Sequence, residues 1–243
     1  MHVPFLLAES DLYFVWERAT LEGKAIIVVL VIFSIFAWSV MGAKALQMRR
    51  ARKLNTYFEA EFHTQKHVLD LFDRRLQATD CPLFVVYQEG CRELDTRLKV
   101  PAAAAGGSIL RKRFVSLKAM EHVKRTLERT VAQQSLKLES GLILLAIAVS
   151  GAPFLGLLGT VWGVMSAFSL VAMKGSADLK TMAPGVAGAL ITTVAGLLVA
   201  IPSMFGYNWL VHNLRVQTVA LDNFAQELVS NMETEYLKEE DDL

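Results

Sequence analysis

Ala152-Pro-Phe-Leu-Gly-Leu-Leu-Gly-Thr-Val-Trp-Gly-Val-Met165 is the most informative stretch of this chain, and it lies inside the long uncharged run Ser140–Met173. A second run, Thr181–Val211, also contains no Asp, Glu, Lys or Arg. Each run exceeds the roughly 20 apolar residues that a helix needs to cross a bilayer. Both contain Gly, Ser and Thr, which permit close helix contact and suit a bundle interior or a pore wall. The sequence therefore predicts a polytopic membrane protein whose spans face one another.

A third predicted span, Ala25–Ala43, lies near the start of the chain between two lysines. A cleaved signal peptide is the competing interpretation, but the run is longer than a typical signal core and no small-x-small cleavage site follows it. A basic cluster follows the run instead, as expected where a span ends on its cytoplasmic side. The cluster consists of Lys44, Arg49, Arg50, Arg52 and Lys53.

The distribution of charge predicts the orientation of the chain. The segment Lys44–Lys137 holds 19 of the 25 basic residues and only 10 acidic ones, which favours the cytoplasm. The first residues are richer in acids and apolar side chains, and we expect an amphipathic helix on the outer face rather than a polar leader. The predicted order is an outer segment at 1–24, spans at 25–43, 140–173 and 181–211, a cytoplasmic helical domain at 44–139, a periplasmic loop at 174–180, and a cytoplasmic helix with an acidic tail at 212–243.

The cytoplasmic segment is predicted to be helical throughout. The helical period of the first span continues beyond residue 54, and a helix over 83–98 follows Pro82, which suits a first helical turn. A loose connection is expected at 101–108, and a further helix is expected to start near Ile109 and run unbroken into the second span. Cys81 and Cys91 both fall in this segment, so reduced thiols are expected rather than a disulfide.

Small residues recur at positions that suit helix contact. Gly156, Gly159 and Gly163 fall in the second span, and Gly188, Thr192 and Gly196 recur every four residues in the third. The small-xxx-small spacing permits close contact, although glycine is also generally common in membrane helices. Pro153 and Pro184 are expected to kink or start their helices. His63 and His67 lack a third ligand at useful spacing, so no metal site is predicted there.

Two blocks of sequence resemble the proton-channel family that includes ExbB, TolQ and the flagellar stator MotA. Gly151–Phe168 is similar to the pattern Ser-Pro-(Phe/Tyr)-(Val/Ile)-Gly-Leu-(Phe/Leu)-Gly-Thr-Val-Trp-Gly-Ile-Met-x-x-Phe of the ExbB/TolQ branch. Ala183–Pro202 is similar to Ala-Pro-Gly-Ile-Ala-Glu-Ala-Leu-x-x-Thr-Ala-x-Gly-Leu-x-x-Ala-Ile-Pro. One position departs from the second pattern, because Gly188 stands where the family has its usual acid.

The resemblance implies an all-α protein of the bacterial inner membrane that forms a ring, expected to be a homopentamer. The ring would surround the single spans of an ExbD- or TolR-like partner and convert the proton motive force into work on a TonB- or TolA-like protein. Thr160 and Thr193 match the pore-facing threonines of the family, whereas Thr192 points about 100° away and is expected to pack against a helix. Without an acid at Gly188, the partner would have to supply the carboxylate of the proton path.

Other function classes receive less support from the residues. No catalytic constellation, cofactor site or nucleic-acid-binding patch is predicted, and the expected contacts are with protein partners and membrane lipid. Thr160 and Thr193 could each bond only the carbonyl four residues back in their own helix. A sodium-coupled stator and a structural scaffold without ion flux therefore stay open, and the sequence does not separate an ExbB role from a TolQ role.

The predicted topology can be tested by accessibility labelling. A reporter fused after Leu243 and a cysteine label placed between residues 100 and 110 should both report the cytoplasm. A cysteine label at Ser176 should report the periplasm, because the second and third spans are connected there. A periplasmic signal from residues 100–110 would contradict the model with three spans.

Overall fold

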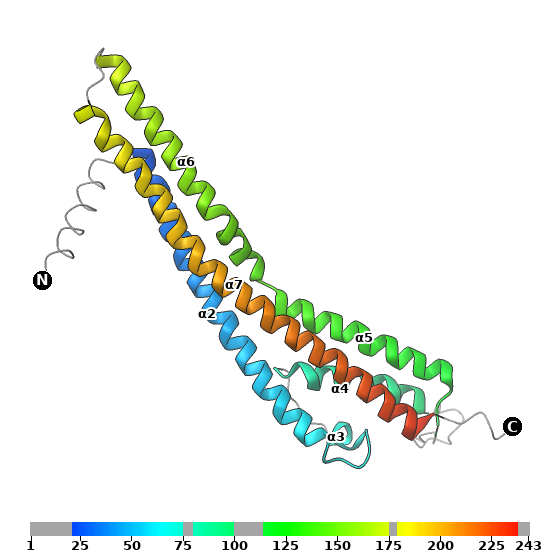
Figure 1. Ribbon diagram of the computed structural model, residues 1–243. Helices are drawn as coiled ribbons and strands as arrows, with labels where there is room; N and C mark the ends of the chain where they lie inside the picture. Colours follow the sequence, from blue (N-terminus) through cyan, green and yellow to red (C-terminus); the bar gives the residue numbers. More distant parts are fainter. Residues whose placement is uncertain (1–20, 75–79, 100–113, 175–178, 238–243) are drawn as a thin grey trace, which may run out of the picture. The chain divides into compact units, whose positions relative to one another are not determined.

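The computed structural model describes residues 21–74, 80–99, 114–174 and 179–237, and these residues are almost entirely helical (Figure 1). The predictions for residues 1–20, for the connection at 101–108 and for the acidic end of the tail fall outside the described ranges. The helices are α2 (Leu21–Phe62), α3 (Asp70–Asp73), α4 (Pro82–Leu98), α5 (Leu117–Glu139), α6 (Leu142–Lys174) and α7 (Leu179–Tyr236).

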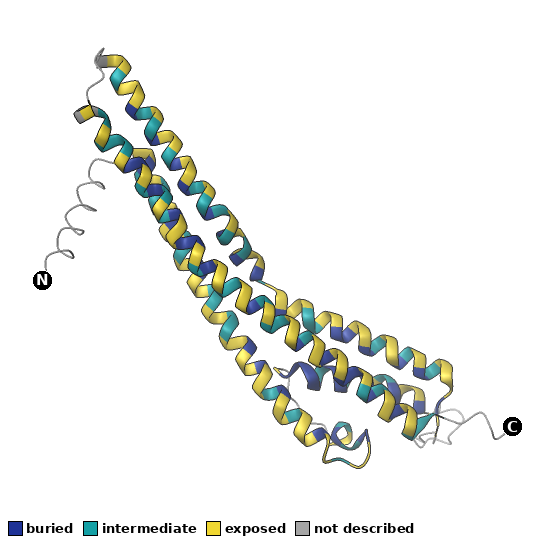
Figure 2. Ribbon diagram, viewed as in Figure 1, coloured by how far each residue is buried: buried dark blue, intermediate teal, exposed yellow. Residues whose placement is uncertain are grey.

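Three of these helices, α2, α6 and α7, are long and apolar enough to cross a membrane, which confirms the expected all-α class with three spans. The chain divides into two compact units, and unit 1 comprises residues 1–44 and 141–210. Many residues of unit 1 are exposed (Figure 2), and large apolar side chains are common among them. Phe154 and Phe205, for example, are 71% and 67% exposed. Contiguous exposed apolar surface of this kind marks contact with lipid or another protein.

The connection between α5 and α6 contradicts the prediction of one unbroken helix. Helix α5 ends at Glu139, and the chain passes through Ser140 and Gly141 before α6 begins. Gly141 has a φ of +84°, in the left-handed region that a residue with a Cβ adopts only with strain. The glycine ends the helix because it takes up this conformation without a steric penalty.

The start of α5 is also later than the predicted position near Ile109. Phe114–Ser116 are not helical, and Val115 donates its backbone N–H to the Tyr236 carbonyl at 2.8 Å. Ser116 then caps the helix, since its hydroxyl accepts the N–H of Ala119 at 3.3 Å. The capping serine, rather than the basic residues before it, sets the beginning of this helix.

Unit 2, comprising residues 45–140 and 211–243, has an apolar core rich in aromatic rings. Phe58 of α2 lies 5.5 Å from the rings of Phe84 and Tyr87 and 5.8 Å from Phe224 of α7, measured between centroids. The Tyr87 hydroxyl donates to the Val68 carbonyl at 2.6 Å and accepts the N–H of Phe72 at 2.9 Å. Both hydrogen-bonding capacities of this buried phenol are thereby used, which removes the cost of burying it.

Helix α4 begins at Pro82 and ends at Leu98, close to the predicted range. Cys81 occupies its N-cap position without a capping bond from its own side chain. Asn55 of α2 takes this role, because its buried amide oxygen accepts the N–H of Leu83 at 3.2 Å and the thiol of Cys81 at 3.4 Å. A cap supplied by another helix satisfies a buried N–H of the first turn, which has no partner within α4, and links α4 to α2.

Both cysteines are buried free thiols, so the structure predicts low reactivity. Burial raises the pKa of the Cys81 and Cys91 thiols, and Cys91 is 0% exposed. Maleimide at pH 7.5 should therefore label the folded protein much more slowly than the denatured chain, in which thiols titrate near pH 8.5. An introduced Glu128→Cys on the exposed face of α5 should label quickly and serves as the control.

The raised pKa of the two thiols also predicts how the stability of the folded protein changes with pH. The folded protein keeps the two thiol protons to higher pH than the unfolded chain, so ionisation above about pH 8.5 favours unfolding. Thermal melts should show lower stability at pH 9.5 than at pH 7.5, and replacing both cysteines with Ala should reduce that difference. Rapid labelling of Cys91 in the folded protein would contradict the buried thiol.

Candidate functional site

Helices α6 and α7 run side by side and antiparallel in unit 1 (Figure 1). Their backbones approach closely because glycines face small residues across the contact. A Cβ added at Gly163 would lie 2.6 Å from the Cβ of Ala189, and one added at Gly159 would overlap the side chain of Thr192. Real Cβ atoms do not approach so closely, so any larger residue at either position would push the helices apart.

The contact continues along both helices at Gly156 and Gly196. A Cβ at Gly156 would lie 2.8 Å from the Thr192 carbonyl oxygen, and one at Gly196 would lie 2.6 Å from the Ala152 carbonyl oxygen. The Cα of Gly156 is only 3.2 Å from the position of that added Gly196 Cβ. The structure thus brings Gly156, Gly159, Gly163, Thr192 and Gly196 together at this contact.

The sequence analysis missed the alanines and one glycine that complete this contact. Ala152, Ala167 and Ala189 are at most 3% exposed, and a Cβ at Gly185 would lie 3.1 Å from the Cβ of Ala167. These residues continue the four-residue spacing, as in Ala152–Gly156 and Gly185–Ala189. Counting alanine as a small residue beside glycine would have found them.

Three threonine hydroxyls meet within this contact between α6 and α7. The hydroxyls of Thr160 and Thr193 are hydrogen-bonded to each other across the contact. Both also lie within hydrogen-bonding distance of the Gly156 carbonyl oxygen, Thr160 at 3.2 Å and Thr193 at 3.3 Å. Thr192, which is fully buried, is 3.0 Å from the same oxygen and 2.7 Å from the Ala189 carbonyl oxygen.

The arrangement provides more acceptors than protons. Each hydroxyl has one proton and two lone pairs. Either Thr160 or Thr193 can therefore donate to the other, and the hydroxyl that accepts this bond can donate its own proton to a carbonyl oxygen. Because Thr192 is satisfied by two carbonyls and Thr160 and Thr193 are only partly buried, this pair retains lone pairs for a further donor. The pair can orient water or a protonated carboxyl group, but it cannot carry a charge.

The remaining predicted positions lie along the same two helices. Gly188 is buried in α7, and the uncharged runs on both sides of the contact contain no carboxylate. Pro153 lies inside α6 and Pro184 lies inside α7 near its start. Neither proline can donate a backbone hydrogen bond, so the carbonyls four residues earlier lose their usual helical partner.

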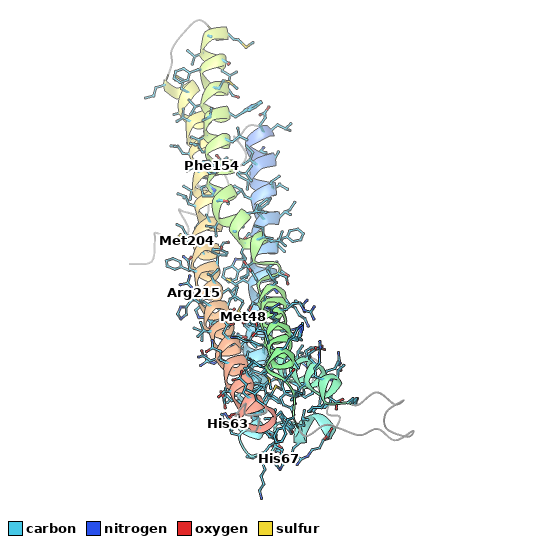
Figure 3. The ribbon with its side chains drawn as sticks, turned by 90° about the vertical axis from the view of Figure 1, so that its right-hand side faces the viewer. Met48, His63, His67, Phe154, Met204 and Arg215 are labelled. Carbon is cyan, nitrogen blue, oxygen red and sulfur yellow. The ribbon has the colours of Figure 1, made fainter. Side chains whose placement is uncertain are left out.

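His63 and His67 lie near one end of unit 2 (Figure 3) and each bonds a different glutamate of α7. His63 Nε2 is 2.9 Å from Glu227 Oε1, and His67 Nδ1 is 2.9 Å from Glu235 Oε1. The second oxygen of Glu235 accepts the Val68 N–H at 3.0 Å. These contacts fasten the end of α2 and the following loop to α7. Among the described residues, no three His, Cys, Asp or Glu side chains are grouped to hold a metal ion.

Comparison with known proteins relates the chain to membrane energy-transduction subunits. A family model described as the MotA/TolQ/ExbB proton channel family matches residues 99–223. The Tol-Pal system protein TolQ of Haemophilus influenzae is 29% identical over 93% of this chain and 95% of its own length, and that of Pseudomonas aeruginosa is 28% identical over 84% and 85%. The biopolymer transport protein ExbB of Xanthomonas campestris is 42% identical over 46% of this chain and 45% of its own length.

A pair of glycine variants tests the contact between α6 and α7. Gly159→Ala places a methyl group against Thr192 and should lower the free energy of unfolding by about 1–3 kcal/mol, the usual cost of overpacking. Gly151→Ala in the same helix meets nothing within 4 Å and should be neutral or slightly stabilising. Thermal unfolding in detergent, with the assembly size checked by native mass spectrometry, measures both; equal stability of the two variants would contradict the tight contact.

Proposed function

Because the chain belongs to the MotA/TolQ/ExbB proton channel family, we propose that it is the multi-copy subunit of a proton-driven motor in the inner membrane. In this proposal several copies, expected to be five, surround the spans of an ExbD- or TolR-like partner. The N-terminus lies in the periplasm and the C-terminus in the cytoplasm. The output is work on a periplasm-spanning protein of the TonB or TolA kind, as in a Tol-Pal or biopolymer transport system.

The observation that carries the proposal is the hydroxyl pair formed by Thr160 and Thr193. These two side chains lie in spans that contain no acidic or basic residue, and they meet across a contact built from glycine and alanine. A charge inside the hydrocarbon layer is costly without a partner, so a proton path needs a titratable group or water. The hydroxyls of this pair supply polar groups in runs that contain no charged side chain.

The missing acid supports a proton-carrying step on the partner. With Gly188 in place of a carboxylate, no side chain of the two uncharged runs titrates near neutral pH. The titratable group would therefore have to come from another protein. A partner Asp would take a proton from one side and release it on the other. Thr160 and Thr193 would hydrogen-bond that carboxyl group or the water that feeds it, and so lower the barrier for transfer.

The threonine pair can be tested by removing the hydroxyls while keeping the side-chain shape. Thr160→Val and Thr193→Val each leave water or the partner carboxyl without a hydrogen-bond partner, which costs about 1–3 kcal/mol. Proton flux should therefore fall roughly 10- to 100-fold if this step limits the rate. Flux driven by a pH gradient is measured in liposomes that contain the chain and its partner.

Matched variants separate flux from folding. Thr130→Val removes a buried hydroxyl of α5, which bonds the Thr126 carbonyl at 2.8 Å, and should leave flux unchanged. Gly188→Ala adds no acid and should also spare flux unless that position requires close packing. Full flux in the Thr160→Val, Thr193→Val double variant, in an intact complex, would remove the pair from the mechanism. Flux that requires Na⁺ would favour a sodium-coupled stator, and no flux with the correct partner would favour a scaffold.

A further inference from the structure

Unit 2 contains a cavity of about 300 Å³ bounded by α2, the start of α4 and the end of α5. Its walls combine apolar and cationic side chains. Leu46 and Leu138 provide apolar surface, Gln134 provides an amide, and Arg50 and Lys137 provide positive charge. The only acid that lines the cavity among the described residues is Asp80.

The charges of the cavity leave it net positive. Arg50 Nη2 lies 2.8 Å from Asp80 Oδ2, but the two side chains are 71% and 60% exposed, so this ion pair is weak. A guanidinium group has five N–H donors in a planar fork, and one carboxylate contact leaves several of them available to an anion. Lys137 forms no ion pair within the described ranges, and its ammonium contributes a second cation.

Several residues that line the cavity lie, in sequence, just outside the ends of two uncharged runs. Along α2, Leu46 and Arg50 follow the uncharged run that ends at Ala43 by three and seven residues, which correspond to about 5 and 10 Å of helix. Lys137 precedes the run that begins at Ser140 by three residues. The headgroup layer of a bilayer occupies roughly 5–8 Å outside each face of the hydrocarbon core. Leu46 therefore falls at headgroup depth along α2, and the backbone of Arg50 lies a few ångströms beyond the layer, a distance that its long side chain can span.

We propose that this cavity binds the phosphate group of an anionic phospholipid from the leaflet that faces the basic side of the chain. Arg50 and Lys137 hold the phosphate, Gln134 bonds the headgroup, and the leucines contact the glycerol and the first methylenes of the acyl chains. A free phosphate ion would use the same cations but would gain nothing from the apolar walls. Leu46 is 68% exposed, so a bound lipid would remove apolar surface of this side chain from water, which a phosphate ion would not do.

Lipid binding to the full chain in detergent tests the site. Native mass spectrometry is used to titrate phosphatidylglycerol and phosphatidylcholine with identical acyl chains. Wild type should bind phosphatidylglycerol at least tenfold more tightly. The double variant Arg50→Gln, Lys137→Gln should lose at least tenfold in affinity for phosphatidylglycerol and keep its affinity for phosphatidylcholine.

Control variants distinguish a site from general attraction between charges. Arg52→Gln in α2 and Lys124→Gln in α5 remove equal charge from exposed positions outside the cavity and should change affinity less than threefold. Arg50→Lys with Lys137→Arg keeps both charges and should retain binding, which guards against a loss caused by misfolding. Equal losses in the control variants, or unchanged binding in the double variant, would overturn the proposal.

Inorganic phosphate supplies the remaining comparison. At millimolar concentration it should compete weakly with phosphatidylglycerol, because it makes no contact with Leu46 or Leu138. Competition as effective as that of a short-chain phosphatidylglycerol would overturn the lipid assignment and identify a site for free phosphate. Neither result depends on proton flux. The binding experiment can therefore disprove the lipid site while the proposed function holds, and the flux experiment can disprove the proposed function while the lipid site holds.

Discussion

Close backbone contact between α6 and α7 is the constraint on which the candidate site depends. Two apolar helices in lipid gain nothing from the hydrophobic effect when they associate, so they are held by dispersion contacts and hydrogen bonds between them. Gly156, Gly159 and Gly163 allow the backbones to come near enough for both. The same closeness lets the hydroxyls of Thr160, Thr192 and Thr193 reach one carbonyl oxygen. With bulkier residues on α6, these threonines could bond only within their own helices.

Unit 2 is stabilised differently, because it contains a large apolar core of its own. Its core is formed mainly by Leu, Val, Phe and Met side chains on α2, α3, α4, α5 and α7, and each large apolar side chain that is fully buried contributes about 1.5–3 kcal/mol through loss of contact with water. Two buried side chains of this core satisfy backbone N–H groups, since Asn55 accepts from Leu83 and Tyr87 accepts from Phe72. The chain thus changes its mode of stabilisation within a few residues of Lys44 and Gly141.

Hydropathy, proline and charge were sufficient to predict the three long helices and the helix that begins at Pro82. The break at Gly141 was missed, because a glycine followed by an apolar run can continue a helix or end it, and only its φ of +84° decides. The asparagine cap of α4 was equally inaccessible, since Asn55 and Leu83 are far apart in the chain. At the candidate site, the spacing of small residues pointed to the glycines. The hydrogen bond from Thr193 to a carbonyl oxygen of the opposite helix could not be predicted, because it depends on how closely the two helices approach.

The uncharged composition of α6 and α7 within the membrane also bears on biogenesis. A single Asp at the centre of a span raises the free energy of insertion by about 2.5–3.5 kcal/mol on the scale measured with the translocon. The runs Ser140–Met173 and Thr181–Val211 carry no such penalty, so each can leave the translocon for the bilayer as soon as it is synthesised. Insertion of these two runs therefore needs no second protein to neutralise a charge within them.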